Sequence, residues 1–69
     1  MNNEEIKNVV MLELVAPEDP NNRLISEDES KELYMRYNTG SRDWHYVFAS
    51  IKDEDKRDKY IQLFKELDK

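Results

Sequence analysis

His45 is the only histidine in the chain and the residue best suited to acid–base chemistry near neutral pH. A catalytic histidine needs a nucleophile or a carboxylate within hydrogen-bond reach. No motif places such a partner beside His45, and the chain contains no Cys. A zinc site would need several carboxylates around this one imidazole, at a spacing that the sequence does not show. We therefore expect no catalytic residue, no metal site, no cofactor and no enzymatic activity.

Trp44, the only tryptophan, lies in the aromatic stretch YNTGSRDWHYVF at residues 37–48, close to Arg36 and Arg42. An aromatic side chain among basic residues can stack on nucleobases. Here the basic residues are few and the net charge is −5, whereas binding to a phosphate backbone needs clustered Lys and Arg. The sequence therefore predicts a core position for Trp44 and no direct nucleic-acid binding.

Acidic residues form the third group that could carry a function. Residues 1–32 contain nine acidic and three basic residues, whereas residues 33–69 contain seven acidic and eight basic ones. Six acids belong to a turn-rich connection at residues 17–32: Glu18, Asp19, Glu27, Asp28, Glu29 and Glu32. Their order does not match a calcium-binding loop. They form either a solvated loop or an acidic site that mimics nucleic acid and inhibits a nucleic-acid-binding protein in a salt-sensitive way.

The elements before residue 33 can be read in two ways. The apolar run VVMLELVA at residues 9–16, ended by Pro17, favours a buried strand. Residues 3–16 also fit a helix capped by Asn3. Ser26 and Glu29 have the spacing of a capping box, so residues 26–38 stay open between helix and strand.

The Gly40–Ser41 step decides the predicted fold. Between two aromatic runs it is typical of a two-residue hairpin turn in which the glycine takes a positive φ. The resulting hairpin, at about residues 32–51, turns six large side chains to one face: Leu33, Met35, Tyr37, Trp44, Tyr46 and Phe48. A helix would instead align Trp44, Val47, Phe48 and Ile51. We favour the hairpin because its turn and its burial pattern select the same register.

A C-terminal helix at about residues 53–68 completes the predicted domain, which spans residues 1–69. Asp53 is a plausible N-cap, and the apolar stripe consists of Tyr60, Ile61, Phe64 and Leu67. The predicted fold is α+β, with a small antiparallel sheet of two to three strands packed by this helix. An all-α bundle of three or four helices is the alternative.

One helix covers only one face of a sheet, so the outer face is predicted to bind a partner. That face carries Met11, Tyr34, Arg36, His45 and Val47, a mixture that is typical of protein interfaces. We expect a small regulator or inhibitor, of the kind that phages and other mobile elements carry. It would bind a partner protein or a second copy of itself, as a homodimer.

A small enzyme or ligand carrier has the least support, because a chain of this length has little room for a pocket of ~300 Å3. No apolar run reaches the ~18 residues of a membrane span, and the segment MNNEEIK does not resemble a signal peptide. We therefore expect a cytoplasmic protein without membrane contact.

Overall fold

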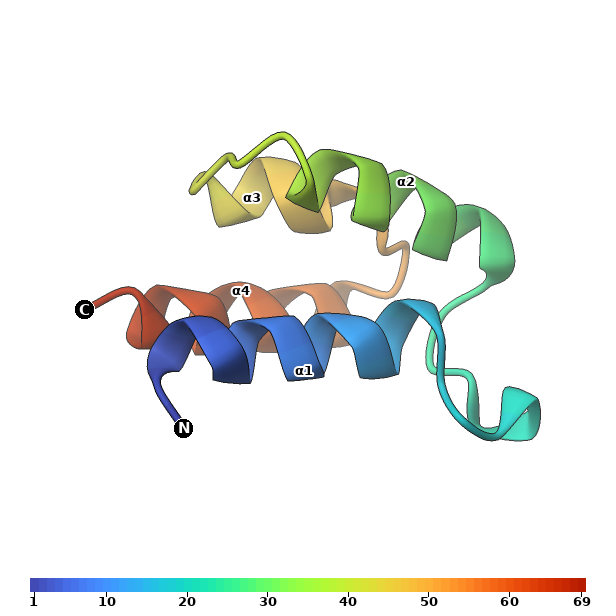
Figure 1. The fold of residues 1–69 in the computed structure, drawn as a ribbon. Coiled ribbons are helices and arrows are strands. Elements are labelled where there is room, and N and C mark those ends of the chain that lie inside the picture. Colours follow the sequence, from blue (N-terminus) through green and yellow to red (C-terminus); the bar gives the residue numbers. More distant parts are fainter.

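Residues 1–69 are all described by the computed structural model, which contains helices and no strand. The α-helices are α1 (Asn3–Val15), α2 (Glu27–Tyr37), α3 (Trp44–Val47) and α4 (Glu54–Leu67), and the short 3-10 helices are η1 (Pro20–Asn22) and η2 (Phe48–Ser50). In Figure 1, α1 and α4 lie side by side in one layer, with α2 and α3 in a second layer. The predicted α+β fold is therefore wrong, and the all-α alternative is the one that the chain adopts.

Each α-helix begins after a side chain that accepts a backbone N–H of its first turn. These N-caps are Asn2, Ser26, Asp43 and Asp53. Ser26 and Glu29 form the reciprocal capping box that their spacing indicates, which makes residues 27–37 a helix. Asp53 caps α4 as predicted. The turn-rich connection before α2 consequently ends at Ser26, rather than at residue 32.

Gly40 has the predicted positive φ, 79°, but it follows a helix instead of turning a hairpin. The N–H groups of Thr39 and Gly40 donate to the carbonyls of Arg36 and Tyr37, both at 3.2 Å, so the last turn of α2 closes on itself. A glycine with positive φ just beyond a helix is a common way to end it. The predicted hairpin is wrong because the residues on both sides of Gly40 satisfy their backbone groups within local helical turns.

The helical period also decides which side chains are buried after Gly40. Val47, Phe48 and Ile51 are each 0% exposed and Trp44 is 5% exposed. The buried positions therefore follow the spacing of one helix face and not the alternation of a strand. Tyr46, placed inward by the hairpin register, is 43% exposed, and Met35 of α2 is 59% exposed. The predicted outer sheet face does not exist.

Phe64 of α4 lies at the centre of the core. Its ring packs edge-to-face against Trp44 and Phe48, with centroid distances of 5.0 and 4.9 Å. Tyr60 and Ile61 are buried beside it, so the C-terminal helix is confirmed, and three of the four residues of its predicted stripe lie in the core while Leu67 is only half-buried. The core position predicted for Trp44 is confirmed as well.

The predicted N-terminal strand is also wrong, since residues 3–15 form α1. Its buried residues, Lys7, Met11 and Leu14, follow the spacing i, i+4, i+7 and face α2 and α4. The run VVMLELVA therefore places apolar residues around most of the circumference of α1. The rest of the chain covers only one side of this helix.

Candidate functional site

Exposed apolar side chains gather along the uncovered side of α1. Four large ones lie on or near this side: Val9 (42% exposed), Leu12 (55%), Leu24 (48%) and Tyr34 (47%). Because Met11 and Leu14 face the core, the helical period turns Val9 and Leu12 outward. A helix that is apolar on all sides is usually covered on all sides. The outer side of α1 is thus the surface of this chain that most resembles a contact surface.

Leu12 and Ala16, one helical turn apart, line two hollows of the surface. The larger, which we call the acidic hollow, has a volume of about 610 Å3 and is lined by Val9, Leu12, Glu13, Ala16, Pro17, Glu18, Asp19, Asn22 and Leu24. The other, the α1–α2 hollow, has a volume of about 480 Å3 and is lined by Leu12, Val15, Ala16, Arg23, Glu27, Ser30, Lys31 and Tyr34. Leu12 and Ala16 therefore form a ridge between a hollow with only acidic charges and a hollow of mixed charge.

The segment after α1 shapes the acidic hollow because several contacts hold it in place. The Asp19 carboxylate accepts the Asn21 N–H at 3.0 Å and so caps η1. The Lys56 ammonium donates to the carbonyl of Leu24 at 2.9 Å. Ile25 is 5% exposed and anchors the end of the segment in the core. These contacts leave the Leu24 side chain at the surface, close to Val9 and Leu12.

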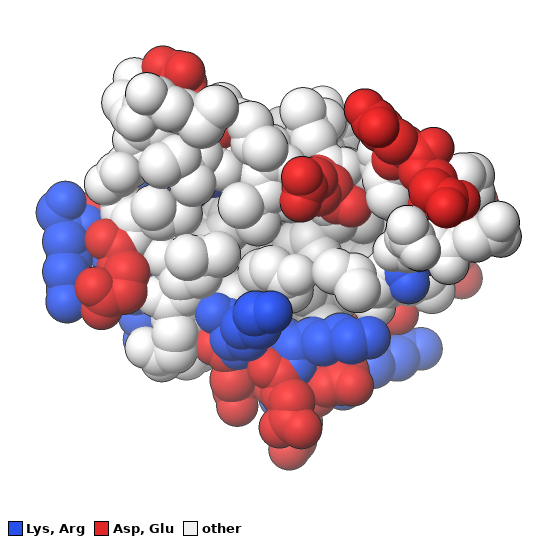
Figure 2. Space-filling model, turned by 90° about the horizontal axis from the view of Figure 1, so that it is seen from below, with Lys and Arg blue, Asp and Glu red and all other residues white.

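Charge is distributed unevenly over this side of the molecule. Every charged residue between residues 8 and 22 is acidic, namely Glu13, Glu18 and Asp19. Glu13 and Glu18 have no hydrogen-bond or ion-pair partner within the chain. In Figure 2 a broad uncharged area with separate acidic side chains contrasts with the charged row at the lower edge, over α4, where both signs are mixed. The outer side of α1 thus combines apolar surface with unpaired acids.

The six acidic residues of the predicted acidic site do not lie together in the structure. Glu18, Asp19 and Glu27 line the two hollows, and Asp28 is exposed in the first turn of α2 outside them. Glu29 accepts backbone N–H groups from Lys52 and Ser26, which hold the pKa of its carboxyl below the usual value. Glu32 pairs with Arg36 at 3.0 Å. Glu29 and Glu32 are thus used for internal contacts.

Of the five residues predicted to bind a partner, only Tyr34 lies at the candidate site, as part of the α1–α2 hollow. Met11 and Val47 are 1% and 0% exposed, because the helical period turns both into the core. Arg36 donates to the backbone carbonyl of Tyr46 and stacks over its ring, and His45 is exposed on α3. The predicted partner-binding residues did not include Val9, Leu12 or Leu24. The signal that could have found Val9 and Leu12 is an apolar run that continues around a helix.

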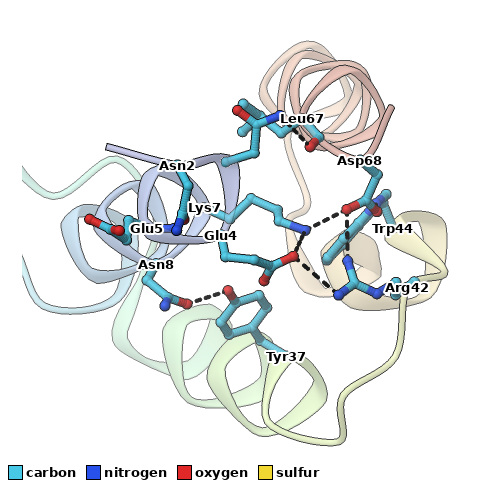
Figure 3. A network of polar contacts seen from close by, with 11 residues as sticks. Asn2, Glu4, Glu5, Lys7, Asn8, Tyr37, Arg42, Trp44, Leu67 and Asp68 are labelled. Atoms are coloured by element: carbon cyan, nitrogen blue, oxygen red, sulfur yellow. Dashed lines mark hydrogen bonds and ion pairs between the residues drawn. The ribbon is translucent and has the colours of Figure 1, made fainter.

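A second cluster of charged residues, which we call the terminal clamp, joins the two ends of the chain. It consists of Glu4, Lys7, Arg42 and Asp68 (Figure 3). The Lys7 side chain is 1% exposed, and its ammonium group pairs with Asp68 and, at 2.8 Å, with Glu4. Arg42 bridges the same two carboxylates at 2.8 and 3.1 Å. The Trp44 indole N–H donates to Asp68 at 2.6 Å, so the clamp is also fixed to the core.

The pKa shifts of Lys7 and Asp68 keep both members of this ion pair charged. Burial alone would lower the pKa of the Lys7 ammonium, but its hydrogen bonds to Asp68 and Glu4 outweigh burial and raise the pKa. Burial would likewise raise the pKa of the Asp68 carboxyl, but hydrogen bonds from Lys7 and Trp44 lower it. A lysine held protonated cannot act as a nucleophile. The clamp is an internal ion-pair network in which both Lys7 and Asp68 are favoured in their charged forms.

No group of three or more His, Cys, Asp or Glu side chains is placed to hold a metal ion. None of the helices has the length and the apolar character needed to cross a membrane. No protein-family model, no curated protein and no solved structure matches the chain. Each of the two hollows is larger than the pocket of ~300 Å3 for which we expected too little room in so short a chain, but most of the side chains that line them are exposed.

Proposed function

We propose that the protein is a non-enzymatic interaction module, a small regulator or inhibitor that binds a partner protein through the two hollows beside Leu12. The observation that carries this proposal is that α1 is apolar around most of its circumference but covered on one side only. The surface differs from the one expected from the sequence, since Tyr34 is the only residue common to both. The cytoplasmic location remains a prediction.

The energetic argument is that this surface has more to gain from contact than the rest of the molecule. Fully burying a leucine side chain is worth about 1.5–3 kcal/mol, so covering the exposed half of Leu12 contributes about 1 kcal/mol. Val9, Leu24 and Tyr34 add comparable amounts because they are exposed to a similar degree. Of these four residues, Tyr34 belongs to a type that often dominates binding energy at interfaces, whereas Leu and Val do so less often.

The test compares two substitutions at similarly exposed apolar positions. Leu12→Gln alters the ridge between the hollows, whereas Met35→Gln, at 59% exposure, lies outside both hollows and serves as the control. Both variants should fold with unchanged far-UV circular dichroism. Proteins captured from an extract of the source cells by immobilised wild type should be lost with Leu12→Gln and kept with Met35→Gln. Equal capture by all three proteins would reject the proposed surface.

The acidic inhibitor that occupies a nucleic-acid-binding site stays as a second candidate function. It is favoured by the unpaired carboxylates of Glu13 and Glu18, and weakened because Glu29 and Glu32 are engaged internally. This candidate predicts that duplex DNA or RNA competes with the protein for the captured partner. Capture that ignores an excess of nucleic acid would leave the apolar interaction module as the better proposal.

A further inference from the structure

We propose that the acidic hollow receives an arginine or lysine side chain from an amphipathic helix of the partner, an inference that rests on the proposed function. The walls of the hollow include the half-exposed apolar side chains of Val9, Leu12 and Leu24. Its charged residues are Glu13, Glu18 and Asp19, and no basic residue lines it. A long cationic side chain has the matching character, since its stem is aliphatic and only its end is charged.

The charge of the hollow also argues against a second copy of this chain as the occupant. In a symmetric dimer the same patch lies on both subunits and meets itself. With the two-fold axis at the acidic hollow, the carboxylates of Glu13, Glu18 and Asp19 would approach the same carboxylates of the second copy without a cation between them. Like charges that face each other across an interface oppose association. A basic side chain of a partner would instead be attracted by these three carboxylates.

The ridge between the hollows constrains how the partner helix is arranged. Leu12 and Ala16 line both hollows, so a helix that crosses α1 here places one side chain on each side of the ridge. On the far side Val15 and Tyr34 provide apolar walls. Arg23 and Lys31 outnumber Glu27 there, so this hollow attracts a second cation less than the acidic hollow does. The partner segment therefore presents a basic residue for the acidic hollow and an apolar residue one helical turn away for the α1–α2 hollow.

The test uses two synthetic peptides with the protein labelled at its Val and Leu methyl groups. One peptide is an amphipathic helix with leucines on one face and arginines beside them, and the other has glutamates in place of the arginines. The arginine peptide should shift the methyl signals of Val9, Leu12 and Leu24, and raising the salt concentration should weaken this effect. The glutamate peptide should not shift them. Equal responses to both peptides, a response centred away from these three residues, or no response to either would overturn the inference.

A charge variant separates this inference from the proposed function. Glu13→Gln combined with Glu18→Gln keeps the apolar walls, and Asp55→Asn combined with Asp58→Asn makes the same change of charge on the exposed face of α4. The first pair should weaken arginine-peptide binding about tenfold at low salt, and the second less than twofold. If the first pair has no effect while Leu12→Gln still abolishes partner capture, the cationic side chain is refuted and the interaction surface stands. If Leu12→Gln is harmless, both proposals fail.

Discussion

Replacing Lys7 by methionine should destabilise the protein by about 2 kcal/mol through the loss of one ammonium group. Removing one partner of a buried ion pair costs about 3–5 kcal/mol when the other charge is left alone. Asp68 is not left alone here, because its side chain is 20% exposed and keeps its contacts with Arg42 and Trp44. Methionine also fills most of the space of the lysine stem. The expected cost is therefore near the lower end of that range or just below it.

This cost would be large for a domain that has only about 3–5 kcal/mol of net stability to begin with. The measurement is equilibrium unfolding in urea, followed by the fluorescence of Trp44, the only tryptophan, and by far-UV circular dichroism. With a denaturant dependence of about 1 kcal/mol per molar urea, the midpoint should fall by about 2 M. The matched control is Lys69→Met, because the Lys69 ammonium pairs with Glu66 at 3.0 Å where both side chains are mostly exposed. That control should cost less than about 0.5 kcal/mol.

A double-mutant cycle with Asp68→Asn tests whether the loss comes from the ion pair. If the pair is responsible, the two changes together should cost at least about 1 kcal/mol less than the sum of the single changes. Two results would contradict our interpretation of the terminal clamp. One is a Lys7→Met variant within about 0.5 kcal/mol of the wild type, and the other is strict additivity of the two substitutions.

Four further predictions concern the fold. Phe64→Ala should cost about 3–5 kcal/mol and leave the chain largely unfolded by circular dichroism, because a ring with no exposed surface is removed from the core. Gly40→Ala should lower the unfolding free energy by about 1 kcal/mol in urea titrations: nothing lies within 4 Å of the added Cβ, so the cost comes from its φ of 79° alone. Ser26→Ala should cost about 0.5–2 kcal/mol in the same titrations, and should loosen hydrogen-exchange protection in the first turn of α2 before that of α4. The pKa of the Asp68 carboxyl is lower in the folded state, so the stabilisation of the fold by this carboxylate is present above its ordinary pKa of 3.8 and is lost as the pH falls through the folded-state pKa. Below about pH 4 the melting temperature of Asp68→Asn should therefore depend less on pH than that of the wild type. An identical pH dependence of the two proteins would contradict the stabilising role of Asp68.

Features that depend on residues within one turn of each other could be predicted from the sequence. The capping box of Ser26 and Glu29, the cap at Asp53 and the positive φ of Gly40 each follow from local backbone chemistry. The stripe of α4 was also predictable, because its apolar residues fit the helical period and no other. These local signals determine the caps and the backbone conformation of single residues, but not by themselves the element to which those residues belong.

The structure of residues 33–51 could not be decided in the same way, because the local signals there fit two structures. A glycine with positive φ suits both a hairpin turn and the end of a helix. The aromatic and aliphatic residues around it give an apolar face with either period. The outcome depends on the core around Phe64, which is distant in sequence. Val47 and Ile51 are buried there together with Trp44 and Phe48 while Tyr46 is exposed, and only the helical period brings this set to one side.

The candidate site depends even more on tertiary structure. The apolar run of α1 has no inner or outer side until α2 and α4 pack against Met11 and Leu14 and leave Leu12 outside. The sequence does show an excess of acidic residues before residue 33. It does not show which of them are unpaired, because the partners of Glu29 and Glu32 are fixed by contacts that form on folding or by helix geometry.

The terminal clamp has a consequence for protein engineering. The clamp holds the two ends next to each other through the Lys7–Asp68 pair, and beside it the Asn3 side chain donates to the carbonyl of Leu67 at 2.9 Å, whereas η1 lies at the opposite end of the molecule (Figure 1). A short linker could therefore join residue 69 to residue 1, and new ends could be opened between Pro17 and Asn22. Such a circular permutant would keep the four α-helices and cut the wall of the acidic hollow, so that folding and partner binding could be measured independently in one molecule.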